Sequence, residues 1–199
     1  MNAKTARRPI STISKSIPAA LILLATVAGC ATESSTDAST AAPLAPKAAN
    51  RATDDIMMSK IEALEGEWEM QNENGDWMTA SVFSVSSNGS VVREIMFPGS
   101  PSEMTNLYHM DGTDAVVTHY CAIGNQPRMV AKGLSKTPDG PAIEYAFDSV
   151  SNLRPDHDHV MGSLRVVFLG DDRIRQDWIS MDKSGATANE MSFNLRRKQ

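Results

Sequence analysis

The segment from Thr118 to Met129, THYCAIGNQPRM, gathers several side chains that could do chemistry. It contains a histidine, a cysteine, an Asn-Gln pair and an arginine. A histidine can exchange a proton near neutral pH, and an arginine can hold an anionic group through its fixed fork of donors. These residues form either a site or simply a strand and the turn that follows it.

Two interpretations of this segment need no metal. In the first, His119 is a satisfied interior histidine, Asn125 and Gln126 hydrogen-bond a turn, and Arg128 pairs with an acid. In the second, His119, Tyr120, Asn125 and Arg128 line one end of a cavity. Arg128 would then hold the anionic headgroup of a ligand, for example a carboxylate.

A third interpretation is a zinc site formed by His119 and Cys121 with His157 or His159. Zinc sites in proteins use four ligands, or three ligands and a water, and four converging ligands are not visible in the sequence. The run Arg154 to His159 could also bind a divalent metal weakly, although such a run is more often a solvated loop. The sequence therefore assigns no metal ligand.

Strand periodicity orients these side chains. Alternate residues of a strand share a face, so Val117, His119 and Cys121 point one way and Tyr120 points the other. An exposed free thiol is a liability in an oxidising compartment, which predicts that Cys121 is buried. His119 would then also point inward.

The sequence gives little support for catalysis. It has no Gly-x-Ser-x-Gly turn, no glycine-rich phosphate loop and no His-Glu-x-x-His helix. His119 and Cys121 lie two apart on one strand face, so their side chains run parallel and do not form a dyad. A binding protein is favoured over an enzyme, and an enzyme of unknown reaction using His119 with Arg128 remains as a further hypothesis.

The amino terminus predicts export and lipid anchoring. Basic residues without any acid precede an apolar run from Ile17 to Ala28. That run has the length of a signal peptide and is too short to span a bilayer. It ends in Val27-Ala28-Gly29-Cys30, which resembles the lipobox of bacterial lipoproteins. The resemblance implies a signal peptide over 1–29 and an acylated Cys30, which would anchor the chain to a lipid bilayer in the bacterial cell envelope, outer membrane or periplasm-facing.

Residues 30–50 are predicted to form the lipidated cysteine and a disordered tether. The stretch after Cys30 is rich in Ala, Ser, Thr and Pro and cannot bury enough apolar area to fold. Of the 2 cysteines, Cys121 would be left without an intramolecular partner if Cys30 carries lipid. The formal net charge of −5 argues against nucleic acid as a partner, because nucleic-acid binding needs a basic surface.

Residues 51–199 are predicted to form one mainly β domain. Met57, Ile61 and Leu64 make the apolar stripe of a short helix, and Gly66 is expected to end it as its C′ glycine. About ten strands follow between residues 67 and 197, separated by turn signals such as Asn74-Gly75. They predict an all-β, antiparallel up-and-down barrel or strongly curled sheet, because closure removes exposed edges. A two-sheet sandwich is the alternative.

The stretch Leu64-Glu65-Gly66-Glu67-Trp68 resembles the Gly-x-Trp start of lipocalin-like (calycin) barrels. In that family an arginine of the last strand packs across the tryptophan, which assigns the role to Arg196 or its neighbour Arg197. The His-Tyr-Cys segment followed by Gly-Asn-Gln-Pro-Arg, and His159 beside Met161, are similar to uncharacterised lipocalin-like proteins of bacteria. The resemblance covers about residues 56–198 and gives Trp68 and Arg196 structural roles.

The resemblance implies a barrel that holds a small apolar or amphiphilic ligand, with His119, Tyr120, Asn125, Arg128 and His159 as candidate contacts. The 12 methionines fit either an adaptable apolar cavity or the filling of an irregular core. The Arg-x-Tyr pair that grips fatty-acid carboxylates is missing, and no haem motif is present, so the sequence names no cofactor. The alternative function is a solid-cored structural or protein-interaction domain of the envelope.

Overall fold

The computed structural model describes residues 51–153 and 159–199. The chain begins with helix α1 (Arg51–Glu62), whose inward side buries the predicted stripe of Met57 and Ile61. Leu64 is also buried, but it lies in the turn after the helix. No helix within these residues is long and apolar enough to cross a membrane.

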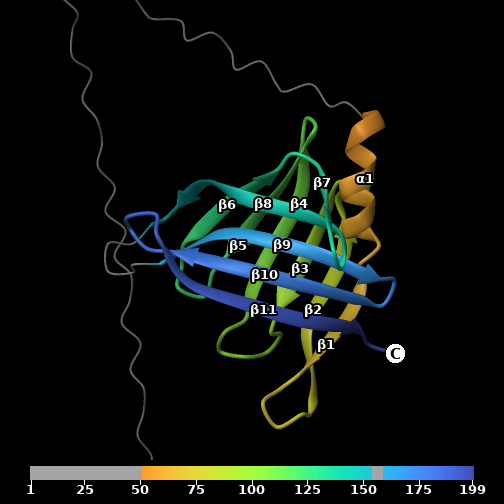
Figure 1. The fold of residues 1–199 in the computed structure, drawn as a ribbon, viewed down its shortest axis with the longest axis vertical. Helices are drawn as coiled ribbons and strands as arrows, with labels where there is room; N and C mark the ends of the chain where they lie inside the picture. The colour runs from red at the N-terminus through yellow and green to blue at the C-terminus, as the bar shows by residue number, and fades with distance from the viewer. Residues whose placement is uncertain (1–50, 154–158) are drawn as a thin grey trace, which may run out of the picture. The chain divides into compact units, whose positions relative to one another are not determined.

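The rest of the described chain is antiparallel β-structure with one short 3₁₀ turn (Figure 1). The elements are β1 (Gly66–Gln71), β2 (Trp77–Ser86), η1 (Ser87–Gly89), β3 (Val91–Met96), β4 (Met104–Asp111), β5 (Asp114–Tyr120), β6 (Gln126–Ala131), β7 (Leu134–Thr137), β8 (Gly140–Ser151), β9 (Val160–Gly170), β10 (Arg173–Met181) and β11 (Thr187–Arg197). Glycines with positive φ occupy the predicted turns, for example Gly75 at 85° and Gly185 at 82°. This all-β meander after one short helix confirms the predicted fold class.

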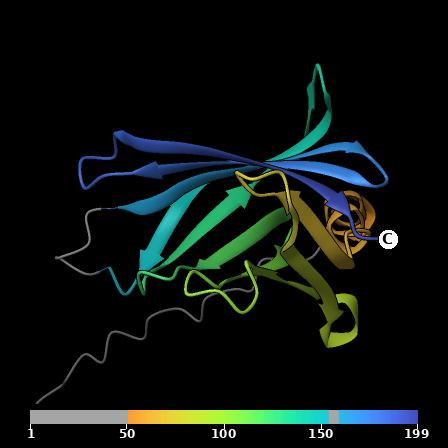
Figure 2. The same ribbon diagram turned by 90° about the horizontal axis from the view of Figure 1, so that it is seen from below.

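Ten of these strands close into a barrel. The strand order is β6-β5-β4-β3-β2-β1-β11-β10-β9-β8, and β6 also pairs with β8, which joins the two ends of the sheet. The first and last strands meet where Trp68 pairs with Arg197. Figure 2 shows the resulting wall from below, with α1 nearly end-on beside the C-terminus. Closure leaves no free strand edge in the wall. The avoidance of exposed edges is the physical reason why the sequence predicts a closed barrel.

β7 is the element that the sequence did not predict. A single strand was expected over about residues 128–134, but the wall strand β6 ends at Ala131 and β7 begins at Leu134. β7 pairs with the first residues of β8, while β6 pairs with the last ones. Gly133 lies at the break between the two strands, and a glycine lacks the side chain that would hold a continuous strand in register.

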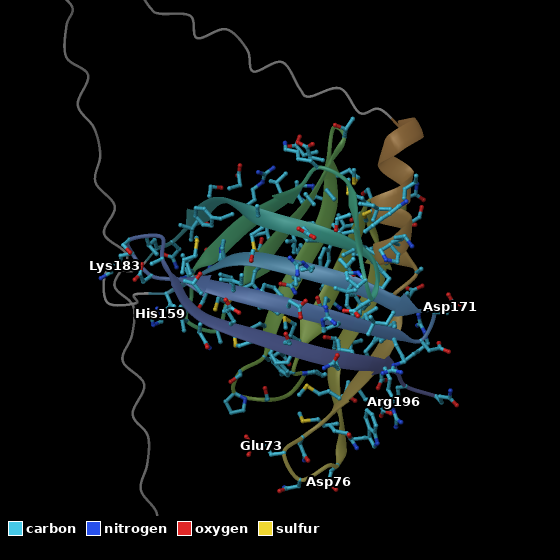
Figure 3. All side chains as sticks on the ribbon, in the orientation of Figure 1. Glu73, Asp76, His159, Asp171, Lys183 and Arg196 are labelled. Atoms are coloured by element: carbon cyan, nitrogen blue, oxygen red, sulfur yellow. The ribbon has the colours of Figure 1, made fainter. Side chains whose placement is uncertain are left out.

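The barrel has two different ends. At the first, called the helix end here, α1 contacts β4 and β5 and lies near the turn that carries Asp171. At the second, the open end, the β5–β6 turn meets the start of β9 through a hydrogen bond from Asn125 to the backbone of His159. Figure 3 shows Asp171 at the helix end and His159 and Lys183 at the open end.

Trp68 joins the helix to the point where the barrel closes. Its ring is fully buried, and its indole N–H donates a hydrogen bond to the carbonyl of Leu64 at 2.7 Å. The guanidinium of Arg197 lies 4.6 Å from the ring centroid and donates to the carbonyls of Ala63 and Glu65 at 2.7 Å each. These three donors satisfy carbonyls of the turn that joins α1 to β1.

Two details of the sequence prediction are corrected here. Arg197, not Arg196, lies across Trp68, because it is the residue paired with Trp68 between the first and last strands. Arg196 instead stacks on Trp77, 3.2 Å from its ring centroid. Gly66 is not the C′ residue of the helix, which ends at Glu62, but the first residue of β1 with φ 123°. A Cβ at Gly66 would lie 3.3 Å from Nη1 of Arg197, so glycine there leaves room for the arginine.

Replacing Arg197 with alanine is expected to lower the free energy of unfolding by about 2 kcal/mol, from two lost charged hydrogen bonds and a lost cation–π contact. Urea unfolding of the full-length protein measures the change. Arg196→Ala is the matched control and should cost about 1 kcal/mol, because its exposed ion pair with Glu69 contributes little and its cation–π contact with Trp77 is also exposed. Equal losses for the two variants would contradict the assignment of the closing contact to Arg197.

Candidate functional site

A row of three polar residues lines the interior of the barrel. Glu94 of β3 pairs with Asn106 of β4, and Asn106 pairs with His119 of β5. All three are buried, with exposed fractions of 0%, 0% and 1%. Residues directly opposite one another on neighbouring strands point to the same face, so the pairing register creates the row.

Glu94 is the centre of a hydrogen-bond cluster. Its Oε1 accepts from the hydroxyl of Ser81 at 2.6 Å and from the amide of Gln176 at 2.8 Å. Its Oε2 accepts from the amide of Asn106 at 2.8 Å and from the hydroxyl of Tyr108 at 2.7 Å. Four donors on two oxygens fit the ionised carboxylate, which can only accept.

The cluster crosses the barrel interior. Gln176 lies on β10, which is separated from β3 in the sheet by β2, β1 and β11. Next to it on the same face, Trp178 packs against His119 with ring centroids 5.0 Å apart. The indole N–H of Trp178 donates to Oε1 of Gln176 at 3.4 Å. At this level the two walls of the barrel are therefore in direct contact.

The ring of His119 is held in one orientation. Nδ1 lies 2.7 Å from Oδ1 of Asn106, whose amide nitrogen donates to Glu94. Oδ1 can only accept, so Nδ1 of His119 carries the proton and donates it. Burial lowers the pKa of His119 to about 4, so the ring is neutral at pH 7 and Nε2 carries a lone pair.

Acid is expected to destabilise the protein through His119. A histidine with a pKa of about 4 when folded and about 6.5 when unfolded makes the unfolded state bind more protons between those values. Stability therefore falls as the pH falls through this window, by about 2 kcal/mol between pH 7 and pH 4.5. Urea unfolding of the full-length protein between pH 7 and pH 4.5 measures this change in the free energy of unfolding. His119→Phe should flatten this part of the pH dependence, whereas a matched change at the exposed residue, His159→Phe, should not. Equal slopes in the two variants would contradict the burial of His119.

Three buried polar atoms have no hydrogen-bond partner among the described residues: Nε2 of His119, Oδ1 of Asn125 and the hydroxyl of Tyr145. Tyr145 stands in a second row, on the opposite wall, in which it pairs with Leu164 and Leu164 pairs with Trp178. Its ring centroid is 6.0 Å from that of Tyr108, and burial together with the charge of Glu94 raises the pKa values of both tyrosines. Buried groups without partners are uncommon and indicate a missing binding partner or water.

The open end of the barrel is rich in methionine. Partly buried apolar side chains from four strands and one loop pack against the core there: Met70, Phe97, Met104, Met161, Met191 and Phe193. The rings of Phe97 and Phe193 meet edge to face at 5.4 Å. Other methionines, such as Met57 and Met129, are fully inside the core. The methionines within the core fill it, as one of the two predicted roles requires, and those that are only partly buried keep more freedom to change conformation.

The structure separates two of the predicted ligand contacts from His119. Tyr120 is 44% exposed, on the other face of β5. Arg128 is ion-paired with Asp148 at 2.6 Å and Asp111 at 3.0 Å, which lowers the pKa of the Asp148 carboxyl. This is the acid pairing of the first interpretation, and Arg128 pairs across the sheet with Thr118, the neighbour of His119 that points to the other face.

Asn125 and His159 meet at the open end through one hydrogen bond from a side chain to the backbone. Asn125 is 1% exposed and donates to the carbonyl of His159 at 3.1 Å, while the His159 side chain is exposed. Gln126 donates to the turn carbonyl of Gly124 at 2.9 Å, as the first interpretation expects. The burial predicted for Cys121 is wrong. β5 ends at Tyr120, so Cys121 opens the turn and is only partly buried.

Cys30 and His157 lie outside the described residues, so the lipidation site and that zinc ligand are not placed. Within the described ranges, no three His, Cys, Asp or Glu side chains converge as metal ligands would. The larger hollows include an open groove of about 710 Å³ across β8 to β11, whose outward side chains include Glu144, Arg165 and Asp177. Tyr145, Leu164 and Trp178, the residues of the second row, also line this groove.

Sequence reasoning missed Glu94, Asn106 and Gln176, although a signal was present. Each alternates with large apolar residues along its strand, and Gln176, for example, stands between Ile174 and Trp178 on one face. A polar residue on the apolar face of a strand predicts a buried hydrogen-bonded group.

Comparisons with known proteins assign no family and no function to this chain. The barrel is similar to the crystal structure of Rv2717c from M. tuberculosis, with a TM-score of 0.48 and 12% sequence identity over 71% of this chain and 97% of that one. No family model and no curated protein matches the sequence.

Proposed function

We propose that this protein is a lipid-anchored lipoprotein of the bacterial cell envelope whose barrel binds a small, largely apolar or amphiphilic molecule. The ligand would enter at the open end and place its polar group on Nε2 of His119. The observation that carries the proposal is this buried nitrogen, which has no hydrogen-bond partner among the described residues and is held in a fixed orientation by Asn106.

The unpaired atoms favour a partner on energetic grounds. Leaving a buried acceptor or donor without a hydrogen bond costs about 1–3 kcal/mol. Such a cost persists in a native protein when function requires the group. A ligand that hydrogen-bonds to Nε2 of His119 would remove this cost on binding, which would add to its affinity.

The methionines explain how a filled interior could admit a ligand. Met70, Met104, Met161 and Met191 are only partly buried, and methionine side chains change shape at low cost. The rigid part of the site is the hydrogen-bonded row from Glu94 to His119, and the adaptable part is this apolar opening. Pockets that combine many apolar contacts with a few placed polar groups are typical of small-molecule sites.

The anchor belongs to the same proposal. Acylation of Cys30 would hold the barrel at a bilayer on a tether of about 20 residues, within reach of apolar molecules. Mass spectrometry of the mature protein tests this: it should begin at an acylated Cys30, and Cys30→Ser should move the protein out of the membrane fraction. An unmodified mature chain would refute the anchor.

Binding can be tested with the neutral fluorescent probe N-phenyl-1-naphthylamine and with native mass spectrometry of the full-length protein. We expect saturable probe binding near one molecule per chain, or a co-purified small molecule of defined mass. His119→Leu should weaken probe binding about tenfold, the equivalent of one hydrogen bond. The matched control His159→Leu, at an exposed position, should leave it unchanged. Absence of saturable binding would refute the proposal.

A solid-cored envelope domain is the second candidate. The bridge from Glu94 to Gln176 and the contact of His119 with Trp178 fill the interior at one level, and this observation favours it. In that case an ordered water would satisfy the unpaired atoms. A protein that carries no small molecule and shows no thermal shift with a panel of lipids would support this candidate.

A further inference from the structure

The charge inside the barrel restricts what it can bind. Glu94 is fully buried, and its two oxygens accept four hydrogen bonds, all from neutral groups. Neutral donors stabilise a carboxylate but do not cancel its charge. The interior wall beside His119 therefore carries a net negative charge.

No buried cation compensates this charge in the part of the chain that the structure describes. The buried polar and charged residues are Ser81, Glu94, Asn106, Asp114, His119, Asn125, Gln176 and Ser180, without a lysine or arginine. The arginine that the sequence offered as an anion holder, Arg128, is bound on the outside by Asp111 and Asp148. An anionic headgroup placed on His119 would find no positive partner.

The hydrogen-bonding chemistry of His119 also disfavours an anionic headgroup. Oδ1 of Asn106 takes the proton of Nδ1, so Nε2 of His119 can only accept. A carboxylate or phosphate also only accepts, and it would face this nitrogen lone pair against lone pair. An alcohol, a phenol, an amide N–H or an ammonium group would donate to it.

We infer that the barrel selects ligands whose polar group is an uncharged or cationic hydrogen-bond donor, and that it rejects fatty-acid carboxylates and other anionic headgroups. This inference rests on the proposed function and names the ligand class of the same site. The titratable side chains that face the region are Glu94, Tyr108, Tyr145 and His119 itself. The negative charge of the carboxylate and the acceptor on the histidine act together.

The test compares three ligands with the same ten-carbon chain: decanol, decylammonium and decanoate. Each displaces N-phenyl-1-naphthylamine from the full-length protein at pH 7 and 0.15 M salt, where the amine and the acid are both fully charged. The charge of Glu94 and a ligand charge about 8 Å away, at an effective dielectric constant of ~20, change the dissociation constant by roughly 30-fold relative to an uncharged ligand. We expect decylammonium and decanol each to bind at least about tenfold more tightly than decanoate.

Decylammonium and decanoate both lose the hydration shell of a full charge on binding. The difference between their affinities therefore reports the sign of the charge that the barrel prefers. Glu94→Gln should narrow the affinity gap between decanoate and decylammonium without closing it, because Nε2 of His119 still disfavours the carboxylate, whereas the matched change at an exposed glutamate of β11, Glu190→Gln, should leave the gap unchanged. If Glu94→Gln does not fold, the order of the ligands on the unaltered protein decides. Decanoate binding as tightly as decylammonium would overturn the inference and leave the proposed function standing. Failure of the probe and all three ligands to bind would overturn both.

Discussion

Replacing Glu94 with alanine is expected to lower the free energy of unfolding by about 4 kcal/mol or more, the range of severe core mutations. The change leaves four buried donors, on Ser81, Asn106, Tyr108 and Gln176, without their acceptor. Each unsatisfied buried group costs about 1–3 kcal/mol. The total is smaller than four such costs, because the desolvation of the carboxylate is relieved and water can fill part of the space.

Urea unfolding of the full-length protein at pH 7 measures this effect. The matched control is Glu144→Ala on β8, whose side chain is 48% exposed and lies 3.4 Å from Arg165. An exposed pair of this kind should contribute less than about 1 kcal/mol. A loss at Glu94 no larger than that at Glu144 would mean that the interior cluster does not form as described.

Replacing Trp68 with alanine is expected to cost about 3–5 kcal/mol, the usual range for removing a buried tryptophan. Its ring is 0% exposed and packs edge to face against Phe83 at 6.4 Å. The change also frees the carbonyl of Leu64 and removes the surface on which Arg197 lies. One substitution thus loosens the helix and the closing strand pair together.

Trp77 provides a control of the same residue type. It is 44% exposed and its main contact is the stacked guanidinium of Arg196. Trp77→Ala should therefore cost less than about 1.5 kcal/mol by the same unfolding measurement, mostly from the lost cation–π contact. If Trp68→Ala cost under about 1 kcal/mol, the assignment of Trp68 to the barrel closure would be wrong.

Local patterns in the sequence determined the elements of this protein. The stripe of Met57 and Ile61 predicts α1 because one face of a helix must be buried. Pairs such as Asn74-Gly75 predict the reversals because few residues adopt positive φ at low cost. Counting the strands between such turns then predicts a closed wall, since an open meander of that length would expose two edges. Where a local signal was weak, at Gly133, the boundary between β6 and β7 was missed.

The tertiary structure alone decided the site. Glu94, Asn106 and His119 form a row only because three strands pair in one register, and Gln176 joins them only because the barrel closes. Which terminal arginine covers Trp68 depended in the same way on the register between β1 and β11. Sequence neighbours of His119, such as Tyr120, were the wrong guide to its spatial neighbours, because adjacent residues on a strand point to opposite faces. Periodicity is a local property and can be read along the chain, whereas register and closure are set by contacts between segments far apart in it.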